Sequence, residues 1–142
     1  MLPQIMQFVI KHWALCGAFI IVAIFIAIEE MRSQGAAGGK VTSARATFLM
    51  NREEAMVIDL RDATAFREGH IINARNYPLA EFDRYQEKLE THRDRAIILV
   101  DAMGVKTAVI ATRLKKAGFH HVVTLKGGMD GWRTDSMPVV RK

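Results

Sequence analysis

Cysteine is almost absent from this sequence of 142 residues, and Cys16 is its only thiol. One cysteine cannot form an intrachain disulfide framework, a zinc site of several thiolates or a Cys-x-x-Cys redox pair. Cys16 also lies within an apolar N-terminal stretch, so the chain from Lys40 onward contains no thiol. That remainder is long enough for one small domain with a single core, and too short for two.

The sequence also lacks a concentrated patch of one charge. Its 20 Lys and Arg outnumber its 15 Asp and Glu, yet the basic residues are scattered and are not interleaved with aromatic residues, as a nucleic-acid surface would require. The adjacent His120 and His121 would point to opposite faces of an extended segment and cannot hold one metal ion together. We therefore expect no nucleic-acid partner, no metal and no cofactor.

Charge is missing from one long N-terminal run. Trp13–Ile28 contains no charged residue, and Phe8–Ile10 precedes it across Lys11 and His12. If Lys11 snorkels to the headgroups, a helix over residues 8–28 has about 21 residues and spans roughly 30 Å, enough to cross hydrocarbon. We predict a transmembrane helix that contacts the lipid bilayer through these residues.

A cleaved signal peptide is the competing interpretation of this run. It is disfavoured because no basic region precedes Lys11 and because Glu29–Arg32 is a poor cleavage region. We therefore assign residues 1–30 to an N-terminal tail and the transmembrane helix.

Basic residues near the two ends of the run indicate its orientation. Arg32, Lys40 and Arg45 follow it, which favours a cytoplasmic domain and an N-terminus outside. Ser33–Gly39 has three glycines and no large apolar side chain, which is typical of a flexible tether. We predict a flexible linker over residues 31–40.

Residues 41–142 alternate short β-branched runs with segments of helical period. The runs that read as buried strands are Met56–Leu60, Ile97–Val100 and Val122–Leu125. The apolar residues that share helical faces are Leu79, Phe82 and Leu89 on one, and Ile110, Leu114 and Ala117 on another that Gly118 can close. This alternation predicts the α/β class, with a central parallel sheet and helices on both sides.

Ligands of such sheets gather at the carboxyl ends of the strands. Two loops qualify, Asp59–Asp62 after one strand and Asp101–Lys106 after another.

Two groups of residues carry a resemblance to a known family. The first runs from Val57–Arg61 through Phe66–Ile71 to Pro78, and the second comprises Leu125–Met129 followed by Gly131, Trp132 and Pro138. In this order they resemble the signatures of a rhodanese homology domain. The resemblance implies a three-layer rhodanese-like domain, and the layout behind one N-terminal transmembrane helix is similar to membrane-anchored bacterial members of the family. This resemblance in layout implies a single-pass protein of the inner (plasma) membrane.

Active members of this family begin the six-residue loop with a nucleophilic cysteine. The family's usual spacing, counted back from Gly118, implies that Asp101 stands at the position of this cysteine. A carboxylate cannot hold a sulfane sulfur as a persulfide, so we expect no catalytic residue and no ordinary sulfurtransferase activity. Asp101 is expected to cap its own loop by accepting backbone N–H groups, and Lys106 is positioned to pair with it.

The remaining polar candidates are expected to be structural. Asp101 as a nucleophile of aspartyl-phosphate type would need a metal and further carboxylates, of which only Asp59 is near. Asp59 and Arg61 are expected chiefly to hold the loop after their strand. His70 has no nucleophile to serve and should bond to backbone, and Trp132 should cover the core.

We hypothesise a membrane-anchored, catalytically inactive module that binds or scaffolds a membrane or membrane-proximal protein at the cytoplasmic face. The residues expected to bind are those of the loop together with one neighbouring cation: Asp101, Ala102, Met103, Gly104, Val105, Lys106 and Arg61. An apolar rim at Met103 and Val105 favours a protein partner.

Two alternatives stay open. In the first, the protein is an enzyme or carrier for a sulfur- or phosphate-containing ligand, with the thiol supplied by a partner, which Lys106 and an open loop would favour. In the second, the transmembrane helix itself associates with other membrane proteins, for which Gly17 and Ala18 offer a thin patch of small residues.

Overall fold

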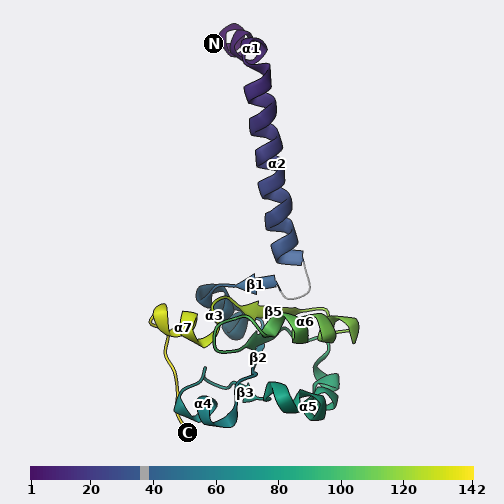
Figure 1. Cartoon of the computed structure of the whole chain (residues 1–142), viewed down its shortest axis with the longest axis vertical. Coiled ribbons are helices and arrows are strands. Elements are labelled where there is room, and N and C mark those ends of the chain that lie inside the picture. The colour runs from purple at the N-terminus through teal and green to yellow at the C-terminus, as the bar shows by residue number, and fades with distance from the viewer. Residues whose placement is uncertain (36–38) are drawn as a thin grey trace. The chain divides into compact units, whose positions relative to one another are not determined.

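The chain divides into two units, Met1–Gly35 and Ala36–Lys142. The structure, a computed structural model, describes residues 1–35 and 39–142 (Figure 1). The first unit consists of two helices, α1 (Leu2–Lys11) and α2 (Trp13–Gly35). The second contains a sheet and its covering helices.

The continuous helix expected over residues 8–28 is broken in the structure. His12 leaves helical geometry, with φ −121° and ψ 32°, and its ring lies 4.8 Å from that of Phe8. Histidine and tryptophan are weaker helix formers than the Ala14 and Leu15 that follow them, which is consistent with an interruption at His12 and Trp13. No single helix in the described residues is long and apolar enough to cross a membrane, although α1 and Trp13–Ile28 pass that test together across a bend of 90°.

The linker predicted over residues 31–40 lies only partly within the described residues. Helix α2 continues through Gly35, and β1 (Gly39–Val41) takes up Gly39 and Lys40. Residues 36–38 lie outside the described residues.

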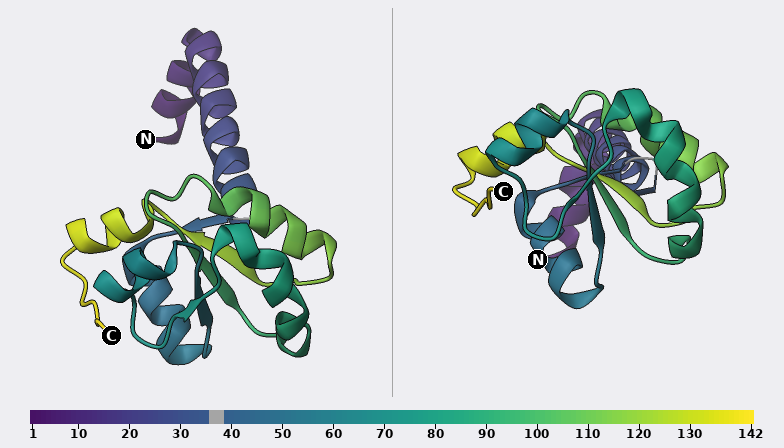
Figure 2. Two further views of the ribbon diagram at one scale, coloured as in Figure 1. Left: turned by 60° about the horizontal axis from the view of Figure 1, so that its bottom comes forward. Right: turned by 90° about the horizontal axis from the view of Figure 1, so that it is seen from below.

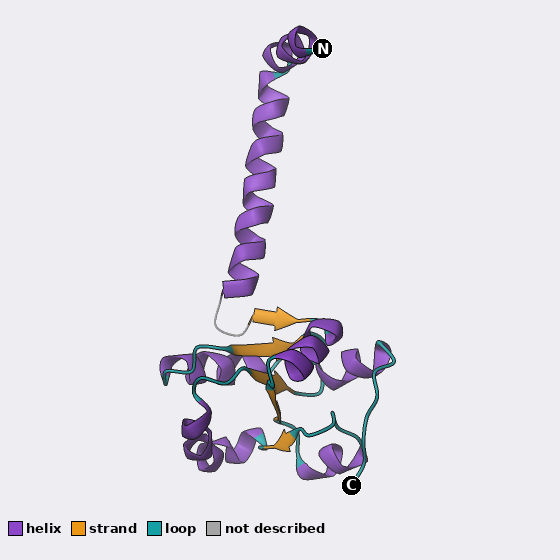
Figure 3. Cartoon of the chain, turned by 180° about the vertical axis from the view of Figure 1, so that it is seen from behind, coloured by secondary structure: helices purple, strands orange, loops and turns teal. Residues whose placement is uncertain are grey.

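The second unit is built on a five-stranded sheet of order β1-β5-β4-β2-β3. Every pair of neighbouring strands is parallel, which confirms the α/β prediction (Figure 3). The other strands are β2 (Met56–Asp59), β3 (Arg75–Asn76), β4 (Ile97–Val100) and β5 (Val122–Leu125). The three predicted strands are the central ones, whereas the sequence analysis missed β1 and β3, which are short and lie at the edges.

Helices cover both faces of the sheet, α5 and α6 on one side and α3, α4 and α7 on the other (Figure 2). The α-helices are α3 (Ser43–Arg52), α4 (Ala63–Glu68), α5 (Phe82–Leu89), α6 (Thr107–Lys116) and α7 (Gly128–Thr134). Short 3-10 turns, η1 (Leu79–Glu81) and η2 (Glu90–His92), flank α5. Gly118 follows α6 with φ +97°, as expected of a residue that ends a helix.

The core has two halves because successive side chains of a strand point to opposite faces of the sheet. Ile97 and Leu99 of β4 pack with Phe82 and Leu114 of α5 and α6. Ile98 and Val100 pack on the other side with residues from α3 and α7, among them Leu49 and Trp132. Burial on both faces explains why the central strands read as continuous apolar runs.

A buried ion pair holds the chain where it leaves β2. Asp59 is 1% exposed, and Nη2 and Nε of Arg61 donate to its carboxylate at 2.7 Å and 3.0 Å. The same guanidinium donates to the Gly69 carbonyl at 2.8 Å, and the Asn76 amide donates to the Arg61 carbonyl at 2.8 Å. These bonds join the strand exit to β3 and to the end of α4.

We predict that Arg61→Ala lowers the free energy of unfolding by about 3–5 kcal/mol, because the Asp59 carboxylate would stay buried without a cation. Urea denaturation measures the loss. Arg113→Ala is the matched control, because it removes an exposed ion pair. The side chains of Arg113 and its partner Asp83 are 45% and 80% exposed, so this variant should lose less than about 1 kcal/mol of unfolding free energy. Equal losses in the two variants would contradict the structural role of Arg61.

Candidate functional site

The two loops singled out in the sequence lie side by side, at the carboxyl ends of neighbouring strands. Strands β2 and β4 are neighbours, with Asp59 opposite Val100, and the Leu60 N–H donates to the Val100 carbonyl at 2.7 Å. Because the strands are parallel, both loops leave at their carboxyl ends, where ligands of such sheets bind.

Asp101 organises the loop between β4 and α6. Its side chain accepts hydrogen bonds from the backbone N–H groups of Gly104 and of Lys106, the latter at 2.7 Å, and the residue is only 6% exposed. This confirms the expectation that Asp101 caps its own loop. The N–H groups that turn inward are therefore satisfied by the protein's own carboxylate, so they are not free for the oxygen of a bound anion.

A pair of glycines, Gly127 and Gly128, packs directly against this loop. The Met129 N–H donates to the Asp101 carbonyl at 2.8 Å, and the Asp130 N–H donates to the Ala102 carbonyl at 3.0 Å. A Cβ at Gly128, whose φ is +59°, would lie 2.4 Å from the Asp101 carbonyl oxygen. Gly128 is thus required for the close approach of the two segments. In the sequence these glycines stand out only as part of a family signature, and the close packing that requires Gly128 was not predicted.

The loop presents apolar side chains to solvent. Met103 is 66% exposed and Val105 is 73% exposed, as the sequence analysis expected of its rim. Val109, in the first turn of α6, is 71% exposed and was missed. It could have been found, because it falls off the helical face on which Ile110 and Leu114 are buried. We refer to Met103, Val105 and Val109 together as the loop surface.

The two cations assigned to this site have different surroundings. Lys106 bonds to Asp101 through its backbone N–H, and its ammonium forms no ion pair within the described residues. The Arg61 side chain is 8% exposed and bonds to Asp59 and Gly69, as expected of a residue that holds the loop after its strand, while a part for it in binding stays a prediction. A carboxylate as buried as that of Asp59 must be paired.

The two other candidates are structural, as expected. His70 is 3% exposed, its Nδ1 lies 2.7 Å from the Phe66 carbonyl, to which it donates, and its ring stacks on that of Phe66 at 3.8 Å. Trp132 is 3% exposed and donates from Nε1 to the Pro138 carbonyl at 2.9 Å. Both residues are therefore buried and bonded to backbone carbonyls.

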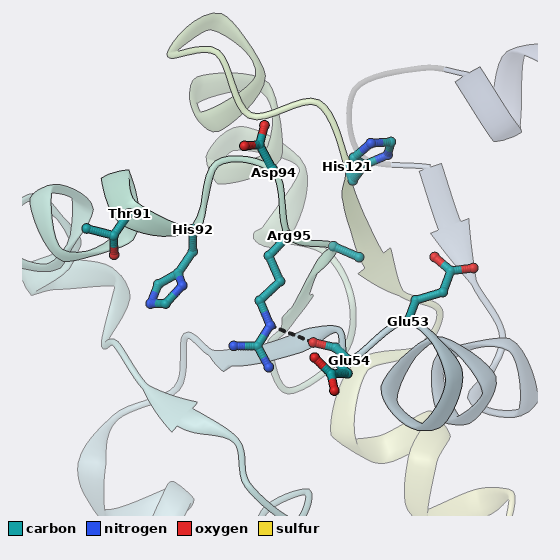
Figure 4. Close-up of a pocket in the computed structure, with 8 residues that line it drawn as sticks. Glu53, Glu54, Thr91, His92, Asp94, Arg95 and His121 are labelled. Carbon is teal, nitrogen blue, oxygen red and sulfur yellow. Dashed lines mark hydrogen bonds between the residues drawn. The ribbon is translucent and has the colours of Figure 1, made fainter.

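A separate hollow of about 530 Å³ lies at the amino-terminal ends of the central strands, away from the two loops (Figure 4). Its lining residues precede β2, β4 and β5 and include Glu53, Glu54, Asp94, Arg95 and His121. Arg95 Nε donates to the Glu54 carbonyl at 2.6 Å across it. Charges of both signs line the hollow, and across residues 1–35 and 39–142 no three His, Cys, Asp or Glu side chains form a metal-binding group. None of the predicted site residues lies there.

Residues 43–135 match the model of the rhodanese-like domain family. The chain is 36% identical over 141 residues to YibN of Escherichia coli, covering 99% of both proteins. It is 26% identical over 94 residues to the thiosulfate sulfurtransferase GlpE of Coxiella burnetii, covering 66% of this chain and 86% of that protein. The crystal structure of a rhodanese-related protein from Thermoplasma volcanium superposes with a TM-score of 0.63 at 25% identity, covering 72% of this chain and 98% of that one.

We predict that Asp101→Cys, made together with Cys16→Ala, creates a thiol of lowered pKa, because the N–H groups of Gly104 and Lys106 would then face a thiolate. The measurement is the rate of alkylation by iodoacetamide as a function of pH. Its midpoint should lie below that of the control Val105→Cys, whose thiol would stand exposed on the same loop. Identical midpoints would show that the loop amides do not stabilise an anion at position 101.

Proposed function

Because the chain belongs to the rhodanese-like domain family, we propose that it is a catalytically inactive, membrane-anchored member that binds a partner protein. In this proposal the loop surface is the contact, and the domain lies at the cytoplasmic face of the inner membrane. The observation that carries the proposal is the Asp101 carboxylate seated among the loop amides.

Two features of the second unit support inactivity. It has no thiol that could carry sulfur, since Cys16 belongs to the first unit. The Asp101 carboxylate also occupies the N–H donors that a thiosulfate or phosphate oxygen would need, and it repels such anions. The occupied donors and the negative charge of Asp101 also weigh against a ligand-handling enzyme or carrier that borrows a thiol from its partner.

The loop surface supports a protein partner. Its three apolar side chains are each more than 60% exposed, those of Met103 and Val105 on the loop and that of Val109 in the first turn of α6. The hydrogen bonds to Asp101 and those from the segment after β5 hold the loop in place. Rigid loops at the edge of a sheet commonly carry binding determinants, and methionine adapts to the shape of a partner. Lys106 lies on the same loop, and its ammonium forms no ion pair within the described residues. The matching partner therefore has an apolar patch with a carboxylate beside it.

The first unit supports anchoring. Trp13–Ile28 carries no charge, and no residue from Met1 to Ile28 is buried. Arg32, Lys40 and Arg45 follow the apolar run, which favours a cytoplasmic domain. A domain joined to the bilayer by a short segment meets membrane-proximal partners at raised effective concentration.

We predict that the purified full-length protein forms no thiocyanate from thiosulfate and cyanide, because no thiolate is available to carry the sulfur. An active thiosulfate sulfurtransferase assayed beside it serves as the positive control. Turnover that copurifies with the chain through successive columns and disappears in Asp101→Asn would overturn the proposed inactivity.

We predict that Met103→Glu together with Val105→Glu reduces crosslinks from a photoreactive residue at Val109 by about tenfold or more in native membranes. Two carboxylates forced into an apolar contact cost more than the ~1.4 kcal/mol that tenfold corresponds to. Crosslinked products are quantified by gel, and the thermal transition should be nearly unchanged because both residues are exposed.

The matched control is Phe48→Glu together with Ile72→Glu, which replaces two exposed apolar residues outside the loop surface. It should leave the crosslinks intact. Crosslinks that persist in the loop variant but vanish when Trp13–Ile28 is exchanged for an unrelated transmembrane helix would place recognition in the membrane instead.

A further inference from the structure

Helix α1 has a narrow polar stripe along one side. Gln4, Gln7 and Lys11 recur at spacings of three and four residues and therefore share a face of the helix. The remaining circumference is apolar, and the residues opposite the stripe are Leu2, Ile5, Met6, Val9 and Ile10. This pattern is that of a helix lying at the boundary between an apolar and an aqueous phase.

Among the described residues of its own unit, none covers this apolar face. Helix α1 has no buried residue, and Leu2, Ile5 and Met6 are 80%, 62% and 66% exposed. Within the unit, α1 lies across the end of α2 instead of continuing it, with a bend of 90° at His12 (Figures 1 and 3). A contiguous exposed apolar face commonly marks a site of contact with a membrane or another protein.

We propose that α1 lies in the plane of the membrane interface, with its apolar face in the lipid and its polar stripe toward water. The inference rests on the membrane anchoring proposed above and deepens it. The occupant is the boundary between lipid headgroups and acyl chains. With Lys11 as the only charge on the stripe, burial of apolar surface carries the contact and anionic lipid is not needed.

The length of the apolar part of α2 favours lipid over a protein partner. Trp13–Ile28 rises about 24 Å, which is short of the roughly 30 Å of hydrocarbon. An interfacial helix sits about 5–10 Å deep at the headgroup boundary. A spanning helix that starts from that depth has less hydrocarbon to cross. A bend that places α1 in the interface therefore allows the short apolar run of α2 to span the remainder.

Trp13 supports the same depth. It begins α2 at the bend and is 76% exposed. Tryptophan favours the headgroup level of a bilayer, where its apolar ring and N–H are both accommodated. Lys11, two residues earlier, ends the polar stripe and reaches water from the same level.

The test uses the full-length chain in phosphatidylcholine vesicles, with Cys16→Ala and one spin label at a time. Labels replace Gln4, Ile5, Gln7 or Val9, and collisions with lipid-soluble oxygen and with a water-soluble nickel chelate are measured. The ratio of oxygen to nickel collisions should be severalfold higher at Ile5 and Val9 than at Gln4 and Gln7. A label at Val22 in α2 reports anchoring independently and should be reached by oxygen alone.

Three results would overturn the inference. A ratio that rises steadily from position 4 to position 9 without alternation means that α1 continues the spanning helix. Equal nickel collisions at all four positions mean that α1 is free in water, while oxygen contact at Val22 leaves the anchor intact. Protection from both reagents at all four positions means that a second copy of the chain covers α1. Nickel collisions at Val22 would instead reject the membrane anchor itself.

A variant separates the apolar face of α1 from the anchor. Ile5→Gln together with Val9→Gln places two polar side chains within the apolar face and leaves α2 unchanged, so the label at Gln7 should lose its contrast with a label at Met6. Oxygen contact at Val22 should persist. If the contrast at Gln7 is unaffected, the apolar face does not position α1.

Discussion

The hydrogen bonds from the loop amides to the buried Asp101 carboxylate determine the rest of the site. Two backbone N–H groups, those of Gly104 and Lys106, turn inward to meet it. Val105 lies between these two residues and Met103 directly precedes them, and both of these side chains are exposed. The same bonds satisfy the donors that would otherwise receive an anion, so one carboxylate closes the site to anionic ligands on a loop that displays an apolar surface.

The fold makes that arrangement rigid. The loop leaves β4 in the middle of a parallel sheet, and the segment after β5 bonds to it through the N–H groups of Met129 and Asp130. Gly128 allows this approach because any side chain there would collide with the Asp101 carbonyl. On the other flank, the buried pair of Asp59 and Arg61 holds the neighbouring strand exit. A preorganised surface binds with less loss of conformational entropy, which suits a domain proposed to act by binding.

The first unit has a different physical problem, since its apolar residues have no protein core to enter. A break at His12 divides them between an amphipathic α1 and an apolar stretch of α2. A lipid bilayer offers two environments, an interface and a hydrocarbon interior, that correspond to these two parts. The proposed roles of the units are thus complementary, with the helices providing attachment and the domain providing recognition.

Local patterns in the sequence sufficed to predict the parallel sheet, its three central strands, the loop after β4 and the bonding of Asp101 to its own loop. Each depends on residues adjacent in the chain or on a repeating period. Tertiary structure alone decided that Arg61 is consumed by Asp59 and Gly69, that Gly128 supports the loop and that the edge strands exist. These features depend on which distant segments come into contact, and the burial of a charge or the closeness of two backbones arises only from that contact.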